Sequence, residues 1–287
     1  MKNILLCTDG SSFAENVYKY GAWFALKFGC HINVLFVTDI RSQQVASTGN
    51  LSGTIGLGSA ENLLHELVNL EHQKAKLNNQ RARLILQNAA AILKAEGVTD
   101  VQLTNKTGFL VDCFDEFEKD ADLIVLGKRG EGAEFASGHL GANIDRIVRS
   151  STKPCLVTPQ EFKPISRLLV AYDGSVTGNN ILQFLAAYPV LTDLEIHLLT
   201  VAKTGKLETA TQTQHQGKLY LQTVGYEPVC SVLEGDPETA ITHYISQADI
   251  SFLLMGAYGH SRIRHLVIGS TTAQLLRSSN IPVLLFR

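Results

Sequence analysis

Apolar and polar positions along the chain change their period several times, and the same order of periods occurs twice. An apolar run over residues 1–8 is followed by a turn at Asp9, a helical spacing of apolar residues, and a second apolar run over residues 31–37. The same segments return over residues 167–201, where Asp173 takes the place of Asp9. This repetition predicts an internal duplication.

The ends of the two copies repeat as well. The matching segments are ADLIVLGKRG with ADISFLLMGAYG, and IVRSSTKPCLVTP with LLRSSNIPVLLFR. Each copy alternates strand and helix, a pattern typical of a parallel sheet flanked by helices. Prolines interrupt the pattern between residues 159 and 166. We therefore predict a first domain over residues 1–160 (the first copy) and a second over residues 165–287 (the second copy).

A glycine motif follows an apolar run near the end of the second copy. Gly256 and Gly259 come directly after residues 250–255, and Gly269-Ser270 follows at the spacing G-x2-G-x9-G-S. Glycine lacks a Cβ, so its backbone can lie close to a ligand. A helix that begins with hydroxyl residues presents N–H groups and the positive end of its dipole to an anion. The motif favours a phosphate site over a turn that uses glycine for geometry alone.

Basic side chains lie between these glycines. Arg262 and Arg264 would add positive charge, and His260 and His265 would add hydrogen-bond donors. The nine histidines show no metal-ligand spacing, because His260 and His265 are five positions apart and do not share a helix face. The segment therefore supports anion binding and not a protein-held metal.

At these residues the sequence resembles the universal stress protein family, whose ATP-binding members carry G-x2-G-x9-G-[ST]. The match in the second copy is complete in spacing and residue type, and the resemblance covers nearly all of the chain. It implies an α/β fold of two tandem doubly wound units, each a mainly parallel five-stranded sheet flanked by helices (universal stress protein, or adenine nucleotide alpha hydrolase-like). The halves would pair as a pseudo-dimer through their last strands, residues 155–158 and 283–286.

The resemblance also implies roles for single residues of the second copy. It places Asp173 at the nucleoside end, with an apolar slot for the base formed by Ala171, Tyr172, Val201 and Met255. The residues that would hold or flank the phosphates are Gly256, Gly259, His260, Arg262, Gly269, Ser270 and Thr271. The protein alone offers no metal site, and a magnesium ion would bridge phosphate oxygens and Ser270 or Thr271.

The first copy departs from this motif. Ten residues, one too many, separate Gly130 from Gly141, and the two hydroxyl residues are replaced by Ala142 and Asn143. Two carboxylates, Glu131 and Glu134, also enter the segment and would repel a polyphosphate, with Lys128 and Arg129 as a partial offset. The site residues corresponding to those of the second copy are Asp9, Val37, Gly127, Gly130, Gly141 and Asn143. We interpret this site as impaired or altered, and the alternative that it binds a different ligand stays open.

The first copy also carries an insertion at about residues 40–75. Asp9 and Asp173 are 164 positions apart, whereas Gly127 and Gly256 are 129 apart, so the first copy holds 35 extra residues. Residues 47–59 are glycine-rich and predict a flexible loop. Residues 60–96 lack glycine and proline and have near-helical leucine spacing, which predicts one long helix or two abutting helices. We expect residues 62–70 to be ordered and packed, on their own domain or on another chain.

Composition excludes several classes of protein. The net charge of −2 argues against a nucleic-acid binder that works by bulk charge. No apolar run approaches the roughly 20 residues that span a bilayer, and the first residues predict a strand and not a signal peptide. The five scattered cysteines favour reduced thiols of a cytoplasmic protein.

These observations predict a tandem universal stress protein, an ATP-binding regulatory protein of the stress response that holds ATP, ADP or AMP in its C-terminal half. Two alternatives stay open: an enzyme that slowly hydrolyses or transfers from ATP, and a nucleotide-free interaction module. The chain lacks G-x-x-x-x-G-K-[ST] and G-x-S-x-G, and no catalytic residue can be assigned. A further homodimer and a protein partner stay open, and neither nucleic acid nor membrane is expected as a partner.

Overall fold

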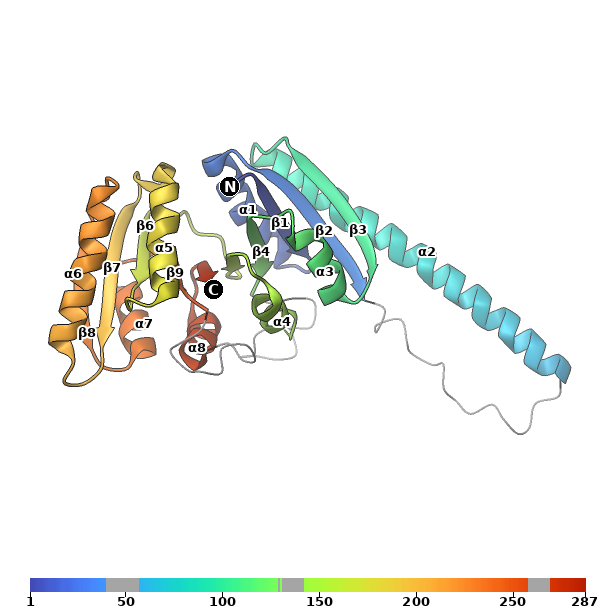
Figure 1. The fold of residues 1–287 in the computed structure, drawn as a ribbon. Helices are drawn as coiled ribbons and strands as arrows, with labels where there is room; N and C mark the ends of the chain where they lie inside the picture. The colour runs from blue at the N-terminus through green and yellow to red at the C-terminus, as the bar shows by residue number, and fades with distance from the viewer. Residues whose placement is uncertain (40–56, 129, 131–141, 258–268) are drawn as a thin grey trace.

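Ten strands form one continuous sheet in the computed structural model of this chain (Figure 1). The structure describes residues 1–39, 57–128, 130, 142–257 and 269–287. The strands of the first copy are β1 (Asn3–Thr8), β2 (His31–Asp39), β3 (Val101–Gly108), β4 (Leu123–Gly127) and β5 (Cys155–Thr158). Those of the second copy are β6 (Arg167–Ala171), β7 (Glu195–Ala202), β8 (Val229–Glu234), β9 (Phe252–Gly256) and β10 (Val283–Phe286).

The sheet order shows the duplication directly. The order is β3-β2-β1-β4-β5-β10-β9-β6-β7-β8, so each copy contributes five neighbouring strands in the same relative order. All neighbours within a copy are parallel, and β5 pairs with β10 antiparallel, with Leu156 opposite Leu284. The expected α/β fold is confirmed, and the two predicted five-stranded sheets join through their last strands into one.

Helices cover both faces of the sheet. The helices of the first copy are α1 (Ala14–Phe28), α2 (Leu57–Ala95), α3 (Leu110–Glu118) and α4 (Ala142–Ser150). Those of the second copy are α5 (Val176–Ala187), the short 3-10 helix η3 (Pro189–Leu191), α6 (Leu207–Thr223), α7 (Pro237–Gln247) and α8 (Ser270–Ser278). Because alternate strand residues face opposite sides, two cores form, one under α1, α2, α5 and α6 and one under α3, α4, α7 and α8.

An aromatic cluster joins the two copies on the first of these faces. Phe24 of α1 lies edge-on to Phe252 of β9, with ring centroids 5.7 Å apart. Phe28 lies edge-on to Tyr188 at 5.3 Å, and Phe184 lies edge-on to Phe286 at 5.2 Å. The core under α1 is therefore continuous with the core under α5.

Two cations bridge the copies on the other face. The Lys128 ammonium, after β4, donates to the backbone carbonyls of Arg277 and Ser279 at the C-terminal end of α8. Arg287, after β10, donates to the carbonyls of Arg149 and Ser151 at the end of α4, at 2.9 and 3.0 Å. Each cation meets the negative end of a helix dipole in the other copy.

Helix α1 does not start as its sequence predicts. Ser12 and Glu15 have the spacing of a capping box, but α1 begins at Ala14 and its N-cap residue, Phe13, makes no side-chain cap. Glu15 instead forms an ion pair with Lys19 at 2.7 Å. The ion pair between residues four apart on the helix competes for the carboxylate that the capping box would need.

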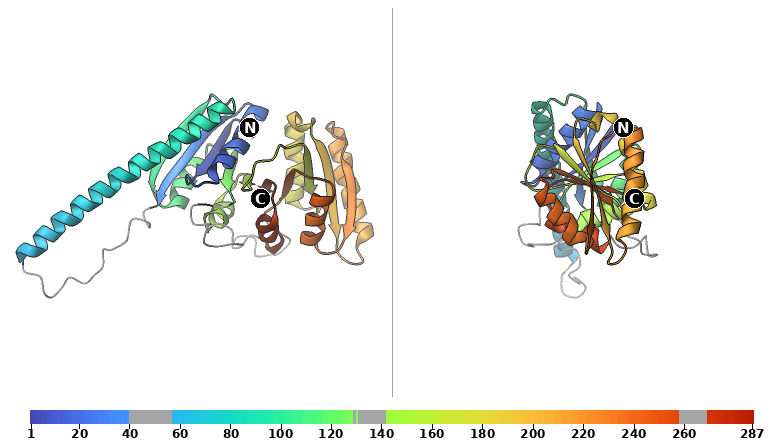
Figure 2. Two further views of the ribbon diagram at one scale, coloured as in Figure 1. Left: turned by 180° about the vertical axis from the view of Figure 1, so that it is seen from behind. Right: turned by 90° about the vertical axis from the view of Figure 1, so that its left-hand side faces the viewer.

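Helix α2 is a single helix of 39 residues, which spans about 58 Å. Its C-terminal part packs on α1, β2 and β3, and it ends before Gly97, whose backbone is left-handed (φ 95°). Figures 1 and 2 both show its N-terminal part running past the edge of the sheet. The long helix is confirmed, although it begins at Leu57 within the predicted loop, whose remainder lies outside the described residues. We expected residues 62–70 to pack on their own domain or on another chain. Residues 65–70 are all exposed, so they do not pack on their own domain, and packing on another chain stays a prediction.

None of the described helices is long and apolar enough to cross a membrane. The five cysteines are free, and burial raises the pKa of Cys7 and of Cys155 to about 12. Within the described residues no group of three or more histidine, cysteine or acidic side chains could hold a metal ion.

Candidate functional site

The candidate site lies where the carboxyl ends of three neighbouring strands of the second copy meet. β6 lies between β9 and β7. The chain runs from β6 to its neighbour β7 and then to β8, and it later returns to β9, which lies beside β6 in the opposite direction along the sheet. Such a switch point opens a crevice at the carboxyl edge of a parallel sheet. The structure brings together three of the predicted base-binding residues, Ala171, Val201 and Met255, in one hydrophobic cluster on the α7 and α8 side.

The fourth predicted residue, Tyr172, points to the opposite face. Its ring is buried in the core under α5 and α6, where a Cβ on Gly217 would lie 2.7 Å from it. Its hydroxyl donates to Asn179 Oδ1 at 2.9 Å. Burial raises the pKa of Tyr172, and the charge of Asp173 raises it further. Only the backbone of Tyr172 is therefore placed to contact a ligand in the crevice.

Asp173 follows β6 and is exposed. Its Oδ1 accepts a hydrogen bond from the backbone N–H of Ser175 at 2.9 Å, which fixes the turn. Ser175 in turn caps α5, its hydroxyl accepting from Gly178 N at 3.1 Å. The turn thus holds a carboxylate at the carboxyl edge of the sheet, where it could accept hydrogen bonds from ribose hydroxyls or a base amine.

The start of α8 is tied to the end of β9. Gly269 is the N-cap residue, and its N–H donates to the Ala257 carbonyl at 3.3 Å. The buried Thr272 hydroxyl donates to the Gly256 carbonyl at 3.1 Å. The N–H groups of the first turn, including those of Ser270 and Thr271, have no acceptor within their own helix. Backbone donors, hydroxyls and a helix dipole therefore meet beside β9, an arrangement suited to an anion.

Several predicted residues lie outside the described residues. They are Gly259, His260, Arg262, Arg264 and His265 of the second copy, and Gly141 and the side chain of Asn143 of the first. Their contribution to a site stays a prediction from the sequence.

The residues of the first copy that correspond to this site lie at the matching strand ends. Val37 and Gly127 are half-buried at the ends of β2 and β4. The backbone of Gly130 lies so close to the Asp9 carboxylate that a side chain at this position would collide with Oδ2. Asp9 Oδ1 also accepts from Ser11 N at 3.0 Å. The chain after β4 therefore closes against the carboxylate that corresponds to Asp173.

Lys128 makes a contact that the sequence does not predict. Its ammonium contacts the end of α8, whereas Glu131 and Glu134, the carboxylates whose charge we expect it to offset in part, lie outside the described residues. The sequence gives no sign of this contact, since it joins residues about 150 positions apart. Thr272 was also missed, although its position as a third hydroxyl in the run after Gly269 could have suggested an anchoring role.

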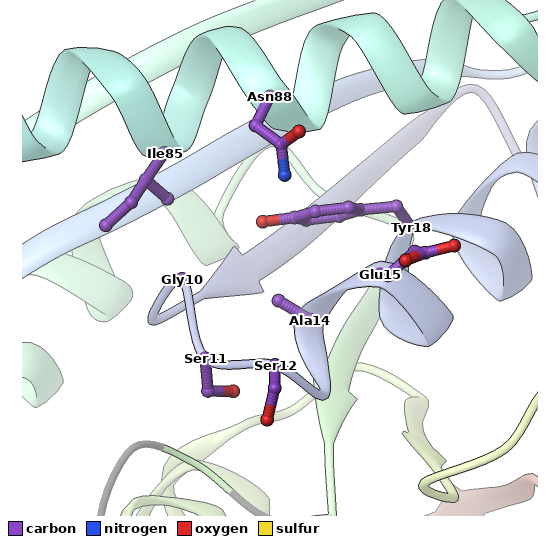
Figure 3. Close-up of a pocket in the computed structure, with 8 residues that line it drawn as sticks. All are labelled: Gly10, Ser11, Ser12, Ala14, Glu15, Tyr18, Ile85 and Asn88. Carbon is purple, nitrogen blue, oxygen red and sulfur yellow. The ribbon is translucent and has the colours of Figure 1, made fainter.

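A separate pocket of about 280 Å³ lies between α1 and α2 of the first copy (Figure 3). Its lining residues are Gly10, Ser11, Ser12, Ala14, Glu15, Tyr18, Ile85 and Asn88. Figure 3 shows Asn88 pointing from α2 toward the ring of Tyr18, whose hydroxyl is 2.6 Å from Thr8 Oγ1. The pocket lies between the turn after β1 and helix α2. Gly130 contacts the same turn at a different residue, the Asp9 carboxylate.

The fold is that of two tandem α/β units joined in one sheet, and comparison with known proteins gives the family. The universal stress protein family model matches residues 1–159 and again 164–287. The chain is 54% identical to universal stress protein Slr1230 from Synechocystis sp. strain PCC 6803, over 100% of both chains. This chain belongs to the universal stress protein family.

Two solved structures of universal stress proteins are similar to this chain to different degrees. A universal stress protein from Archaeoglobus fulgidus superposes with a TM-score of 0.72 at 22% identity, covering 99% of this chain and 96% of that chain. A universal stress protein in complex with cAMP aligns with 56% of this chain and 98% of that chain, at 20% identity and a TM-score of 0.36.

Proposed function

We propose that this chain is a cytoplasmic regulatory protein of the stress response that binds one ATP, in the crevice of its second copy. The start of α8 is the observation that carries this proposal. Thr272 and Gly256 hold its donors beside β9, at the same edge as Asp173. A helix start at this edge can bind phosphate while Asp173 meets the nucleoside.

The apolar cluster of Ala171, Val201 and Met255 supports an adenine base. A nucleotide site combines a mainly apolar lining with a few placed polar groups, and this crevice offers both. Ser270 and Thr271 would take part in holding phosphate oxygens, and a magnesium ion would bridge those oxygens and a hydroxyl. We assign no catalytic residue, so the proposed role is to hold the nucleotide as a signal.

The first copy supports a stoichiometry of one. Gly130 lies against Asp9, so the backbone after β4 comes close to the carboxylate that corresponds to Asp173. Its sequence also replaces the two hydroxyl residues with Ala142 and Asn143. We therefore assign the nucleotide to the second copy alone.

Calorimetric titration with ATP and Mg²⁺ tests this proposal on the full chain. We expect about one nucleotide per chain, with a gain in unfolding free energy of about 2.7 kcal/mol at a hundredfold excess over Kd. Parallel titrations with ADP and AMP, and mass spectrometry of small molecules released on denaturation, identify the preferred nucleotide. A stoichiometry of about two would show that the first copy also binds. Failure of all three nucleotides to bind would overturn the proposal in favour of an interaction module.

A further inference from the structure

Each copy donates hydrogen bonds from a cation to the end of a helix in the other copy. Lys128 donates to the carbonyls of Arg277 and Ser279 at the end of α8, and Arg287 donates to two carbonyls at the end of α4. Both helices cover the same face of the sheet (Figure 1). IVRSS at the end of α4 and LLRSS at the end of α8 occupy the same place in the repeat, and the acceptor carbonyls are the same two positions in each. The two contacts are therefore equivalent on the acceptor side.

The donors of the two contacts come from different places in the repeat. Lys128 directly follows β4, between the first two glycines of the first-copy motif, whereas Arg287 follows β10. The residue that corresponds to Lys128 in the second copy is Ala257, which is buried. The backbone N–H groups of Lys128 and Ala257 donate to corresponding carbonyls at the ends of β5 and β10, at 2.9 and 2.7 Å. The lysine thus gives the first-copy motif a contact that an alanine at the corresponding position cannot make.

α8 is the helix whose start carries the proposed phosphate site. It has nine residues and spans about 13.5 Å, so its two ends move together. Its start is tied to its own copy, since the Thr272 hydroxyl lies 3.1 Å from the Gly256 carbonyl. Its end is tied to the first copy, since the Lys128 ammonium lies 2.9 Å from the Ser279 carbonyl. Carbonyl groups at the end of a helix have no donor within that helix, so a lysine that binds two of them limits fraying and sliding of α8.

The charges at the two ends of α8 act on one helix dipole. A cation at the C-terminal end and an anion at the N-terminal end are both stabilising. The Lys128 ammonium is the cation at the C-terminal end. A nucleotide phosphate beside Ser270 would be the anion at the N-terminal end. Lys128 therefore supports the proposed site both by the position and by the electrostatics of the helix.

We propose that Lys128 is a positioning residue for the nucleotide site of the second copy and acts through α8. The proposal rests on the function proposed above, because it concerns the same phosphate site. It gives the first-copy glycine motif a role that needs no nucleotide of its own. The alternative is that Lys128, like Arg287, only joins the two copies. The two cations form a matched pair, because both hold a helix end in the other copy and only α8 carries the proposed site.

ATP titration of Lys128→Met and Arg287→Met separates these alternatives. Each variant loses one cation between the copies, so urea unfolding should show similar losses of stability in both. In Lys128→Met the ATP Kd should rise about fivefold, the lower end of couplings between distinct sites, whereas Arg287→Met should keep the wild-type Kd. Lys128→Arg retains a cationic donor and should keep most of the affinity. A wild-type Kd in Lys128→Met, or an equal rise of the Kd in Arg287→Met, overturns the proposal.

Amide hydrogen exchange of the nucleotide-free chain gives a measurement that does not depend on ATP. Amides 275–279 at the end of α8 should exchange about tenfold faster in Lys128→Met, and those at the end of α4 should do so in Arg287→Met. Unchanged exchange of α8 in Lys128→Met overturns the positioning role even when the ATP affinity falls. If the wild type binds no nucleotide while α8 exchanges faster in Lys128→Met, the proposed function fails and the support of α8 by Lys128 stands.

Discussion

The two copies share their order of strands and helices, but they enclose the turn after the first strand with different side chains. Gly10 and Gly174 both adopt a left-handed backbone, with φ of 71° and 73°. Ile85 of α2 packs against Gly10, where Thr213 of α6 lies against Gly174. The backbone of the duplicated unit is thus retained while the side chains around its crevices differ.

The same contrast extends to the tyrosines that fill the space behind each turn. In the first copy Tyr18 comes from α1 and bonds to Thr8 of β1. In the second copy Tyr172 follows the strand itself and bonds to Asn179 of α5. A tyrosine thus packs beside the turn in each copy, but it comes from a different element.

The largest effect is expected from Gly269→Val, compared with Gly141→Val. A branched side chain at the N-cap of α8 would block the approach of phosphate, so ATP affinity should fall at least about tenfold. Gly141→Val in the first copy should leave ATP affinity unchanged. Calorimetry measures both, with far-UV circular dichroism as the control for folding. Equal losses in the two variants would remove the proposed difference between the copies.

A smaller loss is expected from Ser270→Ala. The substitution removes one hydroxyl that would bond to a charged phosphate, at a cost of about 1.5 kcal/mol in binding free energy. The backbone donors of α8 stay in place, so binding is weakened and not abolished. The same titration measures it, and Ser278→Ala at the far end of α8 is a matched control. An affinity equal to that of the wild type would exclude the hydroxyl as a ligand contact.

Tyr172→Phe and Tyr18→Phe form a matched pair across the copies. Each removes one buried hydroxyl and its hydrogen bond, so each should lower the free energy of unfolding by about 1 kcal/mol. Because the side chain of Tyr172 faces the core, ATP affinity should be unchanged in both variants. Urea unfolding and ATP titration measure the two quantities. A specific loss of ATP affinity in Tyr172→Phe would place this side chain in the binding site.

No effect on nucleotide binding is expected when residues 44–72 are replaced by a short Gly-Ser linker. The replaced segment includes residues 65–70, which are all exposed, so the oligomeric state or the capture of a partner should change. The crevice beside α8 is on the other copy and should keep its affinity. Light scattering and ATP titration on the same sample separate the two outcomes. Loss of ATP binding would assign the insertion to the nucleotide site.

The parts of the molecule that follow local rules could be predicted from the sequence. Apolar runs located the strands, and the absence of glycine and proline between residues 60 and 96 predicted α2. The features that the sequence did not predict are of two kinds. In some, a side chain had two possible positions or partners, and in others the contacting residues are far apart in the chain. Glu15 could pair with Lys19 or take part in a capping box with Ser12, and it pairs with Lys19. The side chain of Tyr172, directly after β6, could have faced either face of the sheet. The contact of Lys128 with α8 depends on how the copies assemble, which no local pattern encodes.

The continuous aromatic core between the copies has a consequence for how the molecule can be taken apart. A fragment holding only residues 165–287 would expose the ring surfaces of Phe184, Tyr188 and Phe252 that α1 now covers. It would also leave the edge of β10 open, a surface prone to self-association. The intact chain is therefore expected to unfold as one cooperative unit, and the second copy is expected to depend on the first for its solubility.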